Sequence, residues 1–403
     1  MKRVESVLAR CFLFLLSIVV TFVVLELMTN GYLWVLADEK SFARYASLNQ
    51  LFEREKKTES KYSALKRETE RTNKYSPHRY LGYQGAANYT KGKNRHNRLG
   101  YRGEEIAMPK PQGRFRIVCL GGSTTYTTEI DDYKLSYPYL LEKYLKENGV
   151  ADIDVVNAGV GAWSSWESLI NLQFRVLDLD PDLVVVYHSI NDIHPRLVWP
   201  PDVYCGDNSG RRKPGESSLF MPGIFEYSTF FRMLLIRMGK VTPHIAFERT
   251  IDKSPETYYG QQFYKQKKEG VYPKGLFREI PAAQMLESNP PIYFERNIRN
   301  MIAIARAHGL EVVISSFAYS TLFTDEPVVA SQEYVKAHEE NNILLQQTAE
   351  SSGAHFFDFA DKFPTAKQYY ADGRHVNEAG AKLKAQFFGD YLIKQHLVTV
   401  DQK

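Results

Sequence analysis

Apolar runs alternate with amphipathic segments over residues 116–395, and this pattern predicts an α/β domain. Short runs rich in β-branched residues are strand candidates at 116–122, 152–159, 183–189, 310–317 and 355–360. Apolar residues at helical spacing predict helices at about 133–148, 164–177, 291–308, 331–352 and 376–395. Three of the strand candidates are almost wholly apolar, as in strands covered on both faces of a parallel sheet. We therefore expect a doubly wound, three-layer sandwich with a mostly parallel five-stranded sheet.

One long interval interrupts this alternation. Residues 194–290 include the Pro- and Gly-rich stretch WPPDVYCGDNSGRRKPGESS and are rich in aromatic residues. A connection of this length is seldom a bare loop, so we expect an inserted subdomain or a lid over the strand ends. Its aromatic residues would either form the core of that lid or stack against sugar rings, and the sequence leaves both alternatives open.

The N-terminus has a third kind of pattern. Cys11 to Leu25 carry no charge, and the apolar character resumes after Glu26. Roughly 20 to 25 such residues can cross a hydrocarbon core about 30 Å thick, with Glu26 as the one costly interruption. A cleaved signal peptide is the alternative, but the cleavage-like Val35-x-Ala37 lies about ten residues beyond the run. We favour an uncleaved transmembrane anchor within residues 1–37.

Charged and turn-forming residues divide the rest of the chain. Basic residues before the anchor predict that the N-terminus is cytoplasmic and that the α/β domain lies outside the cytoplasm, in a periplasm or lumen; they are Lys2, Arg3 and Arg10. Residues 38–75 are rich in Lys, Arg and Glu with a narrow apolar stripe, which predicts a charged stalk helix. The prolines and glycines of residues 76–115 predict a loop-rich lead-in, and 396–403 form a tail.

Composition narrows the classes of function. The formal net charge is +4, with 51 basic and 47 acidic residues, and gives no reason to expect a nucleic-acid partner. Cys11, Cys119 and Cys205 lack metal-binding spacing, so we predict neither a disulfide framework nor a zinc site. A bridge between Cys119 and Cys205 stays open. We expect no metal and no cofactor.

Candidate catalytic residues follow the first strand candidate and recur near the C-terminus. Ser123 comes directly after Gly121 and Gly122, which let the chain turn without a clashing Cβ atom. Asp372 and His375 are three residues apart, so the carboxylate can reach one imidazole nitrogen while the other faces Ser123. Because ligands of open α/β sheets bind beyond the carboxyl ends of the strands, these groups are expected at one edge. The spacing alone fits a turn aspartate and a surface histidine equally well.

Acyl transfer also requires hydrogen-bond donors for an oxyanion. The stretch NAGVGAW at 157–163 offers backbone amides at Gly161 and Ala162. The stretch HSIND at 188–192 offers the side-chain amide of Asn191, just past the third strand candidate. Each stretch, taken singly, also fits ordinary turn or cap chemistry.

In their order along the chain, these blocks resemble the SGNH, or GDSL-like, hydrolase superfamily. The likeness covers residues 116–194 and 291–395 and implies an SGNH, flavodoxin-like fold that needs no cofactor. It implies that Ser123 is the nucleophile, His375 the general base and acid, and Asp372 the residue that orients His375. The implied oxyanion donors are the Ser123 amide, one amide of the second block and the Asn191 side chain.

Three positions depart from the family pattern. Gly122 stands where the family often has Asp, and Ser189 replaces the usual Gly. The second-block glycine of the family aligns best with Ala162, which keeps the N–H group but adds a Cβ atom. The resemblance therefore leaves open whether Gly161 or Ala162 donates.

The resemblance implies a membrane-anchored serine esterase or O-acyltransferase that forms an acyl-Ser123 intermediate. Its expected substrates are acyl esters, chiefly O-acetyl groups of extracytoplasmic polysaccharide, and a membrane-bound O-acyltransferase is a candidate partner. One alternative is a lipase or lysophospholipase that the anchor keeps near lipid. The other is a catalytically silent scaffold that serves as a binding or assembly module in a membrane complex.

Overall fold

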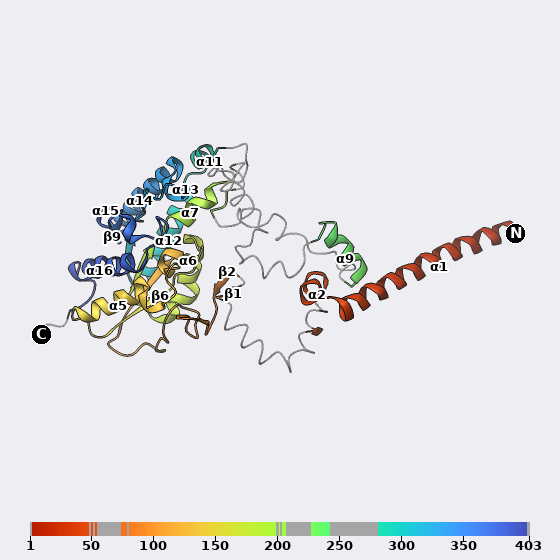
Figure 1. Cartoon of the computed structure of the whole chain (residues 1–403), viewed down its shortest axis with the longest axis horizontal. Helices are drawn as coiled ribbons and strands as arrows, with labels where there is room; N and C mark the ends of the chain where they lie inside the picture. The colour runs from red at the N-terminus through yellow and green to blue at the C-terminus, as the bar shows by residue number, and fades with distance from the viewer. Residues whose placement is uncertain are drawn as a thin grey trace. The chain divides into compact units, whose positions relative to one another are not determined.

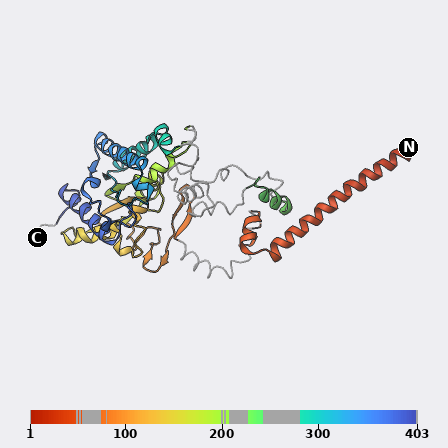
Figure 2. The ribbon, with the colours of Figure 1, turned by 45° about the horizontal axis from the view of Figure 1, so that its top comes forward.

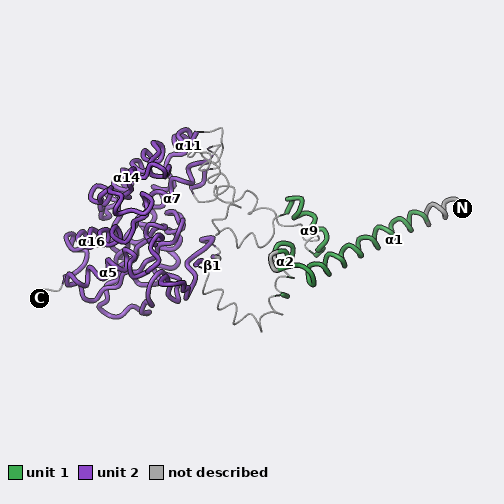
Figure 3. The backbone as a smooth tube through the Cα atoms, in the orientation of Figure 1, with its two compact units in different colours: residues 1–67, 213–252 green, residues 68–212, 253–403 purple. Residues whose placement is uncertain are grey.

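The chain forms two compact units, which Figure 3 draws in different colours. Unit 1 combines residues 1–67 and 213–252, and unit 2 combines residues 68–212 and 253–403. The computed structural model describes residues 2–47, 50, 53–54, 74–78, 80–198, 201, 204–206, 227–241 and 281–400.

A five-stranded parallel sheet forms the core of unit 2 and confirms the predicted fold class. In the order β6-β5-β7-β8-β9, its strands are β6 (Ile153–Asn157), β5 (Phe115–Gly121), β7 (Leu183–Tyr187), β8 (Glu311–Ser315) and β9 (His355–Phe357). Each of the five strand candidates contributes one strand. The last is shorter than expected, because Asp358 accepts a hydrogen bond from the Asp361 amide and caps a helix, α15 (Phe359–Lys362).

Helices cover both faces of the sheet. Successive strand residues point to opposite sides, so each strand contributes side chains to both layers of helices. Ile117 and Cys119 belong to one hydrophobic cluster, while Val118 and Leu120 belong to another. The first cluster includes residues of α5 (Tyr137–Glu147) and α16 (Glu378–Lys394), which lie side by side in Figures 1 and 2. The second includes residues of η3 (Leu172–Val176), α12 (Ile292–Ala307) and α14 (Gln332–Ser352). This is the predicted three-layer sandwich.

Two of the predicted helices are interrupted. The segment at 133–148 is a 3₁₀ turn, η2 (Tyr133–Leu135), followed by α5, whose first turn contains Pro138. A proline is accommodated there because the first N–H groups of a helix have no intrahelical acceptor. The segment at 164–177 is α6 (Ser165–Asn171), which continues as the π-helical η3.

The lead-in at 76–115 contains short strands as well as loops. Strand β1 (Tyr75–His78) pairs with β2 (Gly82–Gly85), and β3 (Thr90–Lys91) pairs with β4 (Asn94–Arg95), both antiparallel. These strands are two to four residues long and mostly polar. Strands this short give no readable alternation of apolar and polar positions, so the sequence did not predict them.

Unit 1 is built on α1 (Lys2–Gly31), which continues as the π-helical turn η1 (Tyr32–Leu36). Residues Arg10–Leu36 contain an 18-residue stretch with a mean hydropathy of 2.7 and are long and apolar enough to cross a membrane, a property that signal sequences share. Two further helices of this unit contact α1, η1 or each other, namely α2 (Glu39–Tyr45) and α9 (Thr229–Arg237).

The expected stalk and insertion are described only in part. Of the stalk at 38–75, residues 39–45 form α2, and most of the remainder lies outside the described residues. Of the insertion at 194–290, α9 belongs to unit 1 and α11 (Ala282–Ser288) to unit 2. Most of the aromatic residues expected to form a lid lie outside the described residues, so the lid stays a prediction.

Candidate active site

Ser123 begins the short helix α4 (Ser123–Tyr126) directly after β5. The chain places β6 on one side of β5 and β7 on the other, so Ser123 stands at the topological switch point of the sheet. A Cβ atom on Gly121 would lie 2.8 Å from a backbone oxygen of β7, and one on Gly122 would lie 2.5 Å from Asn191 Nδ2. The two glycines therefore permit close approach of neighbouring groups to the turn that carries Ser123.

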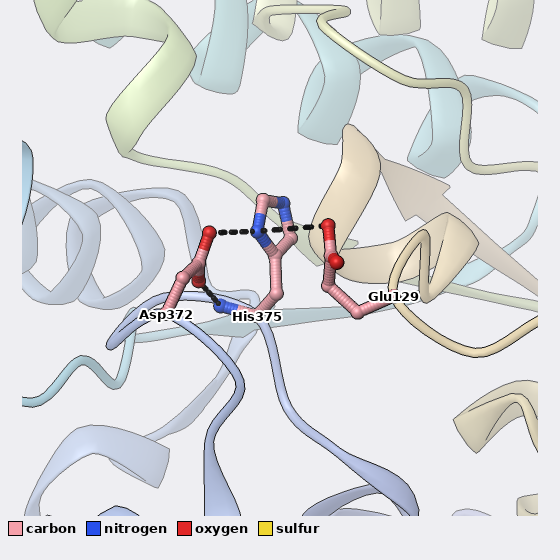
Figure 4. Close-up of side chains that lie close together, drawn as sticks. All are labelled: Glu129, Asp372 and His375. Carbon is pink, nitrogen blue, oxygen red and sulfur yellow. Dashed lines mark hydrogen bonds and ion pairs between the residues drawn. The ribbon is translucent and has the colours of Figure 1, made fainter.

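His375 and Asp372 lie in the loop between the 3₁₀ turn η9 (Lys367–Tyr369) and α16. The His375 Nε2 atom is 2.7 Å from Ser123 Oγ, and His375 Nδ1 is 2.8 Å from Asp372 Oδ2. Asp372 Oδ1 also accepts a hydrogen bond of 2.8 Å from the His375 backbone N–H. The structure thus brings the three candidate residues into one chain of hydrogen bonds, and Figure 4 shows its Asp372–His375 part.

Gly373 shapes the loop between these two residues. Its φ of +83° lies in the left-handed region, and a Cβ atom there would lie 2.8 Å from the Ser320 carbonyl oxygen. The Ser320 N–H donates to the Gly373 carbonyl at 2.7 Å. Glycine at this position lets the loop lie against the chain that follows β8, which holds Asp372 and His375 in place.

The Asp372 carboxyl group is held in its ionised form. Burial raises its pKa, but hydrogen bonds from His375 and the charges of His375 and Arg374 outweigh that effect and leave the pKa well below its usual range. Arg374 Nη2 lies 3.2 Å from Asp372 Oδ2. An ionised Asp372 favours the tautomer with a proton on His375 Nδ1, which leaves Nε2 free to accept the Ser123 proton.

Glu129 is a second carboxylate beside His375, and the sequence analysis did not identify it. Glu129 Oε1 lies 3.9 Å from His375 Nδ1, the ring nitrogen that Asp372 also contacts (Figure 4). Ligand atoms of Glu129, Asp372 and His375 all lie within 4.8 Å of one another, a spacing that could hold a metal ion. Both ring nitrogens of His375 already face Asp372 and Ser123, so a metal at Nδ1 would have to displace the Asp372 contact. These residues fit an oriented base better than a metal centre.

Asn191 lies in α7 (Ile190–Ile193), and its side-chain amide is fixed beside the nucleophile turn. Its Nδ2 atom donates to the Trp163 carbonyl at 2.8 Å. A side-chain amide has two donor hydrogens, so one remains for a further acceptor. In this chain, glycine at position 122 leaves room for the Asn191 amide, since a Cβ atom there would lie 2.5 Å from Nδ2.

The turn at Gly161 and Ala162 is held by the lead-in. The Tyr83 hydroxyl donates to the Gly161 carbonyl at 2.5 Å, and the Gly161 backbone also hydrogen-bonds the Tyr75 hydroxyl. Ala162 has a φ of +64°, a conformation that costs a non-glycine residue about 1–2 kcal/mol. Within the described part of the chain, the Ala162 N–H makes no hydrogen bond to another group. Of the two candidates, this geometry favours Ala162 as the donor.

Lead-in residues support the site in ways that the sequence did not reveal. The rings of Tyr75 and Tyr83 are 5.2 Å apart, and Trp163 Nε1 donates to the Tyr83 carbonyl at 3.2 Å. Strands β1 and β2 therefore pack against the second-block turn. These strands were missed because their aromatic residues follow no regular spacing.

Arg102 fixes the loop that follows the nucleophile. Its buried guanidinium donates to four backbone carbonyls, those of Tyr126, Thr127, Ile130 and Asp131. This loop carries Glu129. In the sequence, Arg102 is an isolated basic residue in the turn LGYRGEE, and nothing there distinguishes it from a surface arginine.

Ser189, the remaining departure from the family pattern, is satisfied by buried partners. Its hydroxyl lies 2.9 Å from His338 Nδ1 and accepts a hydrogen bond of 3.2 Å from Asn341 Nδ2. The serine in place of the usual glycine therefore adds hydrogen bonds behind the site, although Asn341 Oδ1 is buried without a hydrogen-bond partner among the described residues.

Comparisons with known proteins identify relatives by structure only, since no family model and no curated protein matches the chain. The lipase/acylhydrolase from Enterococcus faecalis matches with a TM-score of 0.42 and 13% identity over 72% of this chain and 100% of its own. The acetyl xylan esterase AlAXEase has a TM-score of 0.40 and 13% identity over 69% of this chain and 100% of its own. A protein assigned to the G-D-S-L lipolytic family from Desulfitobacterium hafniense has a TM-score of 0.38 and 11% identity over 68% and 98%. The solved structures that this chain is similar to are thus GDSL-like lipolytic hydrolases and acylhydrolases, the family that its motifs resemble.

Proposed function

We propose that this chain is a serine esterase or O-acyltransferase that carries the acyl group on Ser123. The observation that supports this most directly is the unbroken chain of hydrogen bonds from Asp372 through His375 to Ser123, with distances of 2.8 Å and 2.7 Å. A serine hydroxyl is a weak nucleophile at neutral pH, and a neighbouring base that is itself oriented by a third group activates it.

In the acylation step, Ser123 Oγ attacks the carbonyl carbon of an acyl ester while its proton moves to His375 Nε2. The carbonyl oxygen gains the negative charge, and the amides of Ser123 and Ala162 and the Asn191 side chain would donate to it. When the bond to the alcohol breaks, His375 returns the proton to the departing alkoxide. Asp372 stabilises the imidazolium that exists between these two proton transfers.

In the second step, the acyl group leaves Ser123 for an acceptor. His375 removes a proton from water or from a second alcohol, whose oxygen attacks the acyl carbon, and the proton then passes to Ser123 Oγ as the ester bond breaks. Water gives hydrolysis, and a sugar hydroxyl gives O-acyl transfer. Both outcomes use the same residues, so the acceptor decides between esterase and transferase.

We further propose that the substrates are O-acyl groups, chiefly acetyl, of polysaccharide outside the cytoplasm. This assignment rests on the resemblance of the motifs and on α1, which is apolar enough to anchor the chain. Lys2, Arg3 and Arg10 before the span favour a cytoplasmic N-terminus. A reporter enzyme fused after Lys403 should then be active only outside the cytoplasm, and cytoplasmic activity would reverse this topology.

The central test is the covalent intermediate. Intact-mass spectrometry of the full chain in detergent, after brief mixing with p-nitrophenyl acetate, should show one added acetyl group, which peptide mapping places on Ser123. Ser123→Ala should remain unmodified, while Thr124→Ala, at the neighbouring hydroxyl, should be acetylated as the wild type is. Absence of the adduct together with absence of turnover would favour the silent-scaffold alternative. Faster turnover of long-chain than of short-chain esters would favour the lipase alternative.

A further inference from the structure

Glu26 is the one charged residue between Cys11 and Leu36, in the middle of the span that is apolar enough to cross a membrane. A carboxylate at such a depth is costly unless protein groups satisfy it. Here its oxygens accept hydrogen bonds from Ser228 Oγ at 2.7 Å, from the Thr229 N–H at 2.7 Å and from the Phe230 N–H at 3.1 Å. Within its own helix, it also accepts one of 2.8 Å from Asn30.

These contacts place the start of α9 at the level of Glu26. The N–H groups of Thr229 and Phe230 are the first of α9, so Glu26 supplies the negative charge that a helix N-terminus favours. Phe22, one turn earlier on α1, packs against Phe231 with ring centroids 5.4 Å apart. Because Glu26 precedes Leu36 by ten residues, α9 begins about 15 Å below the end of the apolar span.

Helix α9 also contacts α2, and Figure 3 labels both helices in unit 1. Arg232 Nε donates to the carbonyls of Tyr45 and Ala46, at 3.1 Å and 2.9 Å, which end α2. The Arg237 guanidinium, at the last residue of α9, lies 5.8 Å from the centre of the Tyr45 ring. Helix α9 therefore packs against α1 at its start and against the end of α2 farther along.

The exposed surface of α9 is apolar until its last residue. Its polar residues Thr229 and Arg232 are buried against unit 1, whereas Leu234 and the following Met238 are 41% and 58% exposed. Arg237, the last residue of α9, is exposed. The exposed residues of α1 beside Glu26 are also apolar, with Leu27 67% exposed. Exposed apolar side chains beside an apolar span are typical of a helix that contacts lipid, and an arginine at the helix end can extend its charged group to the membrane surface.

We propose that α9 is embedded in the bilayer beside α1, with Leu234 and Met238 facing acyl chains. The part of the insertion that forms α9 would then give the protein a second membrane contact, which Glu26 connects to the anchor. This inference rests on the proposed membrane anchor, and it does not depend on the chemistry of Ser123.

Photolabelling from lipid tests the proposal. The full chain is reconstituted into vesicles of phosphatidylethanolamine and phosphatidylglycerol that contain a phospholipid with a diazirine on its acyl chain, irradiated and mapped by mass spectrometry. We expect adducts in peptides from α1 and from α9, and none at Ile343, an exposed apolar residue of unit 2. Adducts on α1 alone would overturn the proposal while keeping the anchor, and adducts on neither helix would overturn both.

A cysteine-accessibility experiment tests the part assigned to Glu26. Cys11 and Cys205 are replaced by Ser, and a cysteine is introduced as Leu234→Cys. A membrane-impermeant maleimide should react slowly with this cysteine in the same vesicles. Glu26→Ala should raise the rate at least tenfold, because α9 loses its cap, whereas Leu27→Ala, at an exposed neighbour, should leave it unchanged. Rapid labelling in the parent protein, or equal rates in both variants, would contradict the proposal.

Discussion

Unit 2 contains two clusters of the same three side-chain types, and they differ in burial and in the position of the carboxylate. The cluster that we propose to be catalytic, called the catalytic cluster below, is Ser123, His375 and Asp372, and the buried cluster is Ser168, His188 and Asp192. In each cluster a histidine Nε2 atom lies within hydrogen-bond distance of a serine hydroxyl, at 2.7 Å in the catalytic cluster and 2.8 Å in the buried one.

The carboxylates of the two clusters have different tasks. Asp372 Oδ2 lies 2.8 Å from the second ring nitrogen of its histidine, whereas Asp192 Oδ2 lies 3.7 Å from His188 Nδ1. Asp192 instead accepts hydrogen bonds from the Ser165 N–H and hydroxyl at the start of α6. Burial lowers the pKa of His188 to about 3, so this imidazole is neutral at physiological pH. The buried cluster therefore has the serine–histidine hydrogen bond but lacks a carboxylate hydrogen-bonded to the second ring nitrogen, and all three of its side chains are buried.

The largest expected difference between the two clusters appears when each serine is replaced in turn. Ser123→Ala should reduce hydrolysis of p-nitrophenyl acetate by roughly a thousandfold or more, because no nucleophile remains, without lowering the melting temperature. Ser168→Ala should keep activity within a few-fold of the wild type but cost roughly 1–3 kcal/mol of unfolding free energy, because His188 loses its buried partner. Similar losses of activity in the two variants would refute the distinction between the clusters.

Replacing each aspartate by asparagine tests the same difference between the two clusters. Asp372→Asn should lower kcat by roughly a hundredfold to ten-thousandfold, because an amide cannot stabilise the imidazolium or hold the required tautomer. Asp192→Asn should mainly lower the melting temperature, since it weakens the cap on α6. Steady-state kinetics and thermal unfolding of both variants provide the check. An Asp372→Asn enzyme with unchanged kcat would exclude the assigned role.

Changes at the oxyanion donors should have an effect of intermediate size on activity. In Gly122→Ala the new Cβ atom would lie 2.5 Å from Asn191 Nδ2 and 2.8 Å from the Trp163 carbonyl oxygen, so the amide must move. Activity should fall about a hundredfold, the usual loss for one donor, and Asn191→Ala should lose a similar amount. Because both changes remove the same interaction, the double variant should be little worse than either single variant. Additive losses would mean that Gly122 acts independently of Asn191.

The sequence predicted the sheet and the strand-end position of Ser123 because both depend on local patterns. Apolar runs mark buried parallel strands, and the two glycines mark the turn. The spacing of Asp372 and His375 was equally readable, but only the structure shows that their loop reaches Ser123, since that contact joins residues far apart in the chain.

The supporting residues could not be predicted, for a different physical reason. Tyr83 and Arg102 act through hydrogen bonds to backbone carbonyls of loops that are remote in the sequence, one from Tyr83 and four from Arg102. Such contacts impose no periodicity on the sequence around them. The cap that Glu26 provides for α9 is of the same kind, because the sequence showed only an interruption in an apolar run.

The smallest expected effect is on the pH dependence of stability, and it concerns His188. The pKa of His188 is lowered by burial to about 3, so between that value and about 6.5 the unfolded chain binds a proton that the folded chain does not. Stability from this group is therefore complete above about pH 6.5 and declines as the pH falls below it, by about 2 kcal/mol between pH 7 and pH 5.

His188→Gln removes this titration while keeping a polar side chain near Ser168. Denaturant unfolding of the full chain in detergent, followed between pH 7 and pH 5, should show a shallower loss of stability in His188→Gln than in the wild type. A residual slope is expected, because burial also lowers the pKa of His338 to about 3. His375→Gln should instead abolish activity. If His188→Gln and the wild type lost stability in parallel, His188 would be able to bind a proton in the folded state. Burial would then not distinguish the buried cluster from the catalytic cluster.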